Sequence, residues 1–137
     1  MPKRPVLIDS SIWIRFLRAP AHDTIGALLE SLLRQKLVAT NWLIRLELLS
    51  GTVTTEAFEA LDADLAALRQ LPLNEPLFQA AASLRWKLHR HGTVIPVVDS
   101  LIAASAIQYD CALLHDDKHF RQIARHAPLR FYPIHII

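Results

Sequence analysis

Near the start of the chain, Pro5-Val6-Leu7-Ile8-Asp9 forms an apolar run that is closed by an acid. A run of this length between a proline and an aspartate is typical of a short buried strand. Similar candidate strands follow at 37–40, 70–73, 111–114 and 129–133. Helical patterns alternate with these segments. The alternation predicts right-handed βαβ crossovers and an α/β fold, with a mostly parallel central sheet of about five short strands between helices.

The clearest helical pattern spans 25–33, where apolar residues recur at intervals of three and four positions. Thr24 or Asp23 is a suitable cap for this helix. Further helices are expected from Ser10, after Asn41, from Thr54, over 75–91, over 99–109 and over 118–126. Pro72 lies in the third candidate strand, which favours an edge position for that strand. We expect a single domain over residues 1–137.

Composition narrows the class of protein. The chain has 137 residues, of which 52% are hydrophobic, so a sizeable core can form. Its one cysteine, Cys111, excludes an internal disulfide framework. No segment approaches the ~20 apolar residues needed to span a bilayer, and Asp9 interrupts the N-terminal apolar run too early for a signal peptide. We therefore expect a cytoplasmic protein without a membrane partner. The net charge of +2 permits an anionic partner.

Four acids stand out by their position: Asp9, Glu47, Asp99 and Asp117. Three of them follow a hydrophobic segment, and in parallel sheets the binding crevice lies outside the carboxyl ends of the strands. Carboxylates that meet there raise each other's pKa unless a cation joins them. Such oxygen ligands suit Mg²⁺ or Mn²⁺. Metal sites of this kind usually perform phosphoryl transfer or phosphodiester hydrolysis.

Helix capping is the alternative role for three of these acids. Asp9, Asp99 and Asp117 each precede a predicted helix, where an aspartate cap contributes about 0.5–2 kcal/mol. One carboxylate can also cap a helix and bind a cation, so both roles stay open. Glu47 differs, because it lies about two turns into its predicted helix and has no capping role. The chain has no cysteine–histidine zinc motif and no glycine-rich phosphate loop.

Four segments of the chain resemble PIN-domain proteins of the VapC toxin type. The first two are Val6-Leu7-Ile8-Asp9-Ser10-Ser11-Ile12-Trp13-Ile14 and Leu46-Glu47-Leu48-Leu49-Ser50-Gly51. The others are Ile95-Pro96-Val97-Val98-Asp99-Ser100-Leu101-Ile102-Ala103-Ala104-Ser105-Ala106 and Leu113-Leu114-His115-Asp116-Asp117-Lys118-His119-Phe120. They occur in the order and spacing of the family. The resemblance implies the PIN-like three-layer α/β/α fold.

The resemblance also implies a site. Asp9, Glu47, Asp99 and Asp117 fall on the acidic catalytic and metal-binding positions, and spacing to Phe120 favours Asp117 over Asp116. They would hold one or two Mg²⁺ or Mn²⁺ ions and cleave RNA with a metal-activated water. Two positions depart from the family pattern: His115, where threonine or serine is commoner, and His119, where another acid is often found. Arg15, Arg18 and Lys118 are candidate contacts for the RNA backbone.

Partners follow from the same resemblance. VapC toxins are held inactive by a small cognate antitoxin whose C-terminal segment crosses the active-site groove, and they are usually homodimers. An apolar wall for that segment is expected from Trp13 and the helix over 25–33. Two other functions remain open: a non-catalytic RNA-binding PIN-like domain, and a stand-alone RNA-processing nuclease without an antitoxin. A phosphatase or receiver-like protein with Asp9 as nucleophile fits less well, because the later strands end in acids.

Overall fold

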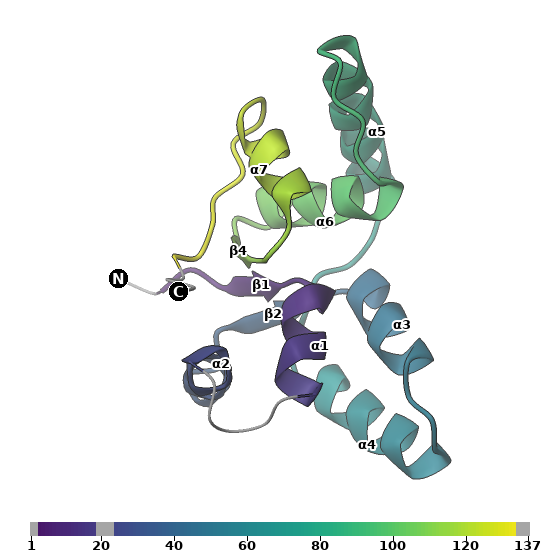
Figure 1. The fold of residues 1–137 in the computed structure, drawn as a ribbon, viewed down its shortest axis with the longest axis vertical. Helices are drawn as coiled ribbons and strands as arrows, with labels where there is room; N and C mark the ends of the chain where they lie inside the picture. The colour runs from purple at the N-terminus through teal and green to yellow at the C-terminus, as the bar shows by residue number, and fades with distance from the viewer. Residues whose placement is uncertain (1–2, 19–23, 134–137) are drawn as a thin grey trace.

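The central sheet is parallel and has the strand order β3-β2-β1-β4 (Figure 1). This computed structural model describes residues 3–18 and 24–133. The strands are β1 (Val6–Ile8), β2 (Val38–Thr40), β3 (Arg69–Gln70) and β4 (Ala112–Leu114). The predicted fifth strand is reduced to one bridge, in which Phe131 pairs with Leu113 in the parallel direction. β3 lies at the edge of the sheet, as the neighbouring proline predicted.

Seven helices connect the strands within the described residues. They are α1 (Ser10–Arg18), α2 (Thr24–Arg34), α3 (Trp42–Ser50), α4 (Thr55–Ala66), α5 (Glu75–Arg90), α6 (Val97–Gln108) and α7 (Lys118–Ala124). Asn41 and Thr54 cap α3 and α4 through their side chains, as predicted. The predicted helix over 99–109 begins earlier, at Val97, because Pro96 takes the capping position. Asp23, the alternative cap of α2, lies outside the described residues.

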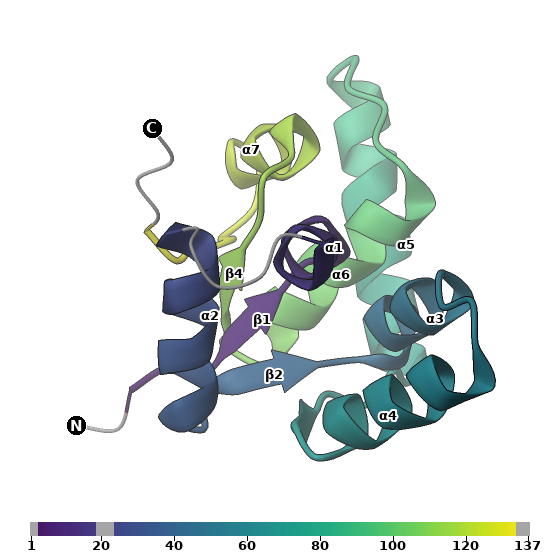
Figure 2. The same cartoon turned by 60° about the horizontal axis from the view of Figure 1, so that its bottom comes forward.

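The helices form layers on both sides of the sheet. Figure 2 shows α1 and α2 in front of the strands and α6 behind them. Ile12 of α1, Leu29 of α2 and Ile102 of α6 all belong to one buried core together with the strands. All three residues of β1 are buried, as expected for a parallel strand with both faces covered. The predicted three-layer α/β/α fold is confirmed.

Three turns after helices use the left-handed backbone region. Lys36 follows α2 with φ 58°, Gly92 follows α5 with φ 77°, and Asp110 follows α6 with φ 53°. In each turn, the next residue donates its N–H to a helix carbonyl five positions earlier, for example Leu37 to Leu32 and Cys111 to Ala106. The turns after α2 and α6 lead the chain directly into β2 and β4.

The order of the strands reverses at β1, which pairs with β2 on one side and β4 on the other. Ligands of open parallel sheets bind at such a switch point, outside the carboxyl ends of the strands. The backbone N–H of Asp9 donates to the carbonyl of Leu114 over 2.9 Å, which ties the ends of β1 and β4 together. The site-bearing segments therefore meet there. No helix in the described part of the chain is long and apolar enough to cross a membrane.

Candidate active site

Asp9 joins the end of β1 to the start of α1. Its carbonyl accepts hydrogen bonds from the N–H groups of Ile12 and Trp13, the first bonds of the helix. Its carboxylate is buried, with 5% of the residue exposed. Oδ2 accepts the Ser11 hydroxyl at 2.6 Å and the Ser11 N–H at 3.3 Å. Asp9 thus caps α1 while its carboxylate faces the switch point of the sheet.

Asp117 also caps a helix. It lies three residues beyond β4, and its Oδ1 accepts the N–H of His119 at 2.9 Å to begin α7. The neighbouring Asp116 is exposed and makes no such contact. The choice of Asp117 over Asp116 as the site residue stays a prediction.

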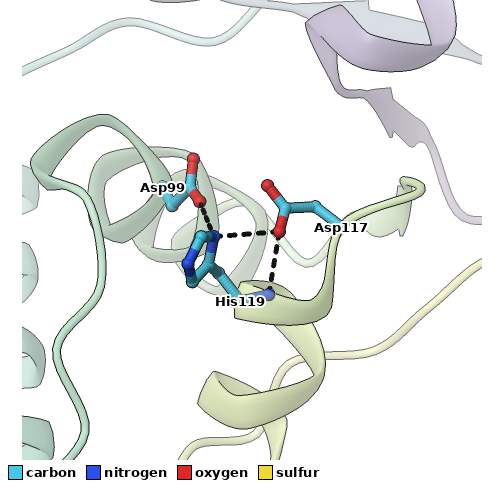
Figure 3. Close-up of side chains that lie close together, drawn as sticks. All are labelled: Asp99, Asp117 and His119. Atoms are coloured by element: carbon cyan, nitrogen blue, oxygen red, sulfur yellow. Dashed lines mark hydrogen bonds and ion pairs between the residues drawn. The ribbon is translucent and has the colours of Figure 1, made fainter.

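Asp99 is not a cap, which corrects the alternative role considered for it. It is the third residue of α6, and Pro96 at the capping position offers no side-chain hydrogen bond. Its carboxylate instead points from the first turn of α6 toward α7 (Figure 3). Oδ2 is buried and has no hydrogen-bond partner among the described residues. A buried carboxylate oxygen without a partner is costly, so its position requires another explanation.

The pKa of Asp99 is raised, because its surroundings disfavour the charged carboxylate. Burial, then the charge of Asp117, then the charge of Asp9, raises its pKa from 3.8 to about 6, and His119 opposes this. Both other aspartates therefore lie within electrostatic reach of Asp99. The cluster stores repulsion that a cation would relieve.

His119 completes this cluster. Its Nδ1 lies 3.2 Å from Oδ2 of Asp99 and 2.9 Å from Oδ1 of Asp117 (Figure 3). Ligand atoms of these three residues all lie within 4.8 Å of one another, and no other group in the described residues has this property. Sequence analysis marked His119 only as a departure from the family pattern. Its position two residues after Asp117, where an acid is usual in the family, was the available signal.

Glu47 is tied to the site through α1 and stays outside the tight cluster. Its Oε2 accepts the hydroxyl of Ser10 at 2.8 Å, and Ser10 directly follows Asp9. Glu47 is exposed and lines a groove of about 340 Å³ between α1, α3 and α4. The structure therefore groups Asp99, Asp117 and His119 most closely, with Asp9 in electrostatic reach and Glu47 beside them.

His115 is half-buried, and its Nδ1 supports the backbone beside the cluster. Its Nδ1 accepts the N–H of Asp117 at 3.1 Å. Its ring contacts Phe120 and Phe131, at centroid distances of 5.1 and 4.4 Å. Burial, then the charge of Arg121, lowers its pKa. His115 thus positions the loop that carries Asp117.

The expectation that Trp13 and the helix over 25–33 form an apolar wall beside the site is wrong. Trp13 and Leu32 are buried in the core, and Leu28 packs against it. These residues face the sheet because the apolar side of α2 covers it. The exposed apolar side chains near Glu47 belong instead to Ile14 and Leu17, on the outer side of α1.

These residues fit a divalent cation. The unpartnered Oδ2 of Asp99 is an anionic oxygen that lacks a donor, and the neighbouring carboxylates supply further hard ligands. A cation placed among them would give that oxygen a partner and would cancel the repulsion that raises the pKa of Asp99. The carboxylates match the Mg²⁺ or Mn²⁺ considered from sequence, and the imidazole adds a ligand type that suits transition metals.

Comparison with known proteins identifies the family of the chain. The family model for the PIN domain matches residues 6–126. Ribonuclease VapC11 of Mycobacterium tuberculosis and a VapC ribonuclease of Mycobacterium bovis are each 33% identical over 126 residues, covering 88% of this chain and 92% of each relative.

Two solved structures share the fold. VapBC from Salmonella typhimurium, bound to DNA, has a TM-score of 0.75 at 18% identity, covering 95% of this chain and 98% of that one. VapBC2 from Rickettsia felis, bound to a promoter DNA fragment, has a TM-score of 0.74 at 21% identity, covering 93% of this chain and 96% of that one.

The family model spans most of the chain, and the acids at the ends of β1 and β4 and in α6 lie within its limits. The chain therefore belongs to the PIN domain family, among the VapC ribonucleases.

Proposed function

We propose that this protein is a metal-dependent endoribonuclease and the toxin of a type II toxin–antitoxin pair, acting in the cytoplasm. The observation that carries the catalytic part is the buried, unpartnered Oδ2 of Asp99 within reach of two further aspartates. The substrate class comes from the relatives named as ribonucleases. An anionic cluster of this kind repels the phosphates of RNA by itself, so a cation has to lie between the carboxylates and the phosphate.

The four acids would divide the work. Asp9 and Asp99 would hold Mg²⁺ or Mn²⁺ directly, while Glu47 and Asp117 would hold it through water or orient the attacking water. Such an ion lowers the pKa of bound water and stabilises the charge that develops on the phosphodiester. Ser11 fixes the carboxylate of Asp9, and Ser10 fixes that of Glu47. These hydroxyls limit the rotation of both acids, which preorganises the site.

Basic residues beside the site would orient the RNA backbone. Arg18 lines the same groove as Glu47, and the exposed Lys118 begins α7 next to Asp117. Both offer positive charge at the rim of an acidic cluster, where it can contact phosphates that flank the cleaved bond. Arg15 lies on α1, the helix that follows Asp9, and is a third candidate for contact with the RNA backbone.

Cleavage of a structured RNA by purified protein tests the activity. Wild-type protein should cut with Mg²⁺ or Mn²⁺, and EDTA should abolish cutting. Asp9→Asn and Asp99→Asn should each lower the rate by at least about 100-fold, because removing one electrostatic contact to the transition state costs that much. Asp64→Asn, at an exposed position on α4, is the matched control. RNA binding without any cleavage would favour the non-catalytic alternative.

The antitoxin would occupy the groove between α1, α3 and α4. The groove is largely apolar, lined by Ile14, Leu17, Leu48 and Leu61, and carries Glu47 at one side. A C-terminal segment with an arginine flanked by hydrophobic residues would match both features. The arginine would place its charge at the acids and exclude the RNA phosphate.

Growth and binding measurements test this partner. Expression of the chain alone should arrest growth, and Asp99→Asn should not. Leu17→Asp should weaken the complex with the small partner and leave RNA cleavage intact. Leu46→Asp is the control, because Leu46 is exposed on α3 outside the groove lining. Harmless expression together with no recovered partner would favour a stand-alone RNA-processing nuclease.

A homodimer is the third part of the proposal. Large apolar side chains are exposed on α5 and at the start of α6, including Trp86 at 60% and Val97 at 55%. Exposed apolar surface of this kind often marks an interface between proteins. Light scattering coupled to size exclusion should give twice the chain mass of 15.5 kDa. A monomer at all concentrations would refute this part alone.

A further inference from the structure

His119 has an unusual position for a histidine that only packs. It extends from the second residue of α7 to the first turn of α6, and its Nδ1 lies between two carboxylates (Figure 3). The Nδ1 atom is buried, and neither short contact has hydrogen-bond geometry. Both contacts are therefore at ion-pair distance, and neither is a directed hydrogen bond within the described residues.

The spacing of the three atoms matches ligands of one cation. Bonds of about 2.1 Å at right angles place neighbouring ligands roughly 3.0 Å apart. The observed distances from Nδ1 are 2.9 Å to Asp117 and 3.2 Å to Asp99. Neither Nδ1 of His119 nor Oδ2 of Asp99 makes a hydrogen bond within the described residues. A neutral imidazole can therefore offer the lone pair of Nδ1 to a metal beside this oxygen.

We propose that Nδ1 of His119 is a direct ligand of the cation, together with Asp99 and with Asp117, which would then bind the ion directly rather than through water. The site would therefore prefer transition-metal ions to Mg²⁺. The inference rests on the proposed function, since it assigns the metal class of that same site. Imidazole suits transition metals, whereas Mg²⁺ takes carboxylates and keeps its waters. An acid at position 119 would give an all-oxygen set, so histidine at this position sets the choice of metal.

The other histidine near the cluster does not serve this role. Nδ1 of His115 already accepts the N–H of Asp117, and its ring is packed against Phe120 and Phe131. Because His115 positions the loop that carries Asp117, it is not a suitable control. His89, which is exposed on α5 and is not part of the cluster, is the control histidine.

Pulsed electron paramagnetic resonance of Mn²⁺ bound to the full chain tests the ligand directly, without RNA. Wild-type protein should show modulation from a coordinated imidazole nitrogen. The modulation should disappear in His119→Ala and in His119→Asp, and persist in His89→Asn. Bound Mn²⁺ without nitrogen modulation in wild type, or modulation that survives His119→Ala, would overturn the proposal.

Calorimetric titration of the metal-free protein tests the selectivity. The ratio of the Mg²⁺ to the Mn²⁺ dissociation constant should fall by at least about tenfold in His119→Asp, with the same ratio in His89→Asn as in wild type. An unchanged ratio in His119→Asp would refute the selectivity. Absence of any cation binding to wild type would overturn both this inference and the metal-dependent reaction. Mn²⁺ binding that requires Asp99 but not His119 would overturn this inference alone.

Discussion

Asp99→Asn should stabilise the metal-free protein, and only above a certain pH. The pKa of Asp99 is raised from 3.8 to about 6 by burial and by Asp117 and Asp9. Below about pH 3.8 the group is protonated in both the folded and unfolded states and costs nothing. Between these two values the unfolded state loses the proton first, and above about pH 6 the full cost of ionising the folded state applies.

The size of the effect follows from the same values. At about 1.4 kcal/mol for each tenfold change in proton affinity, the raised pKa corresponds to about 3 kcal/mol above pH 6. The asparagine amide has to find its own partners in the buried site, so a net gain of about 1–3 kcal/mol is expected. For a chain of this length, that gain raises the melting temperature by roughly 3–10 °C.

Thermal unfolding in EDTA at pH 7.5 and pH 4 measures this gain. Asp99→Asn should melt higher than wild type at pH 7.5, and the two should converge at pH 4. Asp64→Asn, at an exposed position, should show no such pH dependence. An equal difference at both pH values, or no difference at pH 7.5, would show that the carboxylate is not destabilised by its surroundings.

Further expected outcomes concern metal and fold. Mn²⁺ at 100 times its dissociation constant should stabilise wild type by about 2.7 kcal/mol in thermal unfolding, and Asp99→Asn should lose this gain. Lys36 and Gly92 both have positive φ, which glycine adopts more easily than other residues. Lys36→Gly should therefore stabilise the chain by roughly 1 kcal/mol, and Gly92→Ala should destabilise it by a similar amount. Unchanged midpoints of urea unfolding would contradict this. The buried guanidinium of Arg45 binds Asp62 and Gln70 and stacks on Trp42. Arg45→Lys should therefore lower the free energy of unfolding in urea by about 2 kcal/mol. A loss below about 0.5 kcal/mol would contradict this expectation.

Strand ends were the most predictable part of the site. Asp9 and Asp117 follow short apolar runs, and the parallel pairing of β1 with β4 brings those runs together. Local sequence is sufficient here because a run of buried residues and the acid that ends it are adjacent in the chain. The single domain over residues 1–137 and the catalytic roles of the four acids stay predictions.

Contacts between distant segments were not predictable in the same way. The amphipathic pattern of 25–33 shows which side of α2 is apolar, and does not show that the sheet covers it, so the expected wall at Leu28 and Leu32 was wrong. The ring of His119 meets Asp99 only because α6 and α7 pack together. Buried Arg45 also depends on partners 17 and 25 residues away in the chain.

Anomalous diffraction from a crystal of the protein soaked in Mn²⁺ tests the central claim most directly. The account predicts a manganese peak between the carboxylates of Asp99 and Asp117, with Nδ1 of His119 bound to it and Asp9 directly or through water. A fully occupied manganese site elsewhere on the chain, with no peak among these residues, would contradict it.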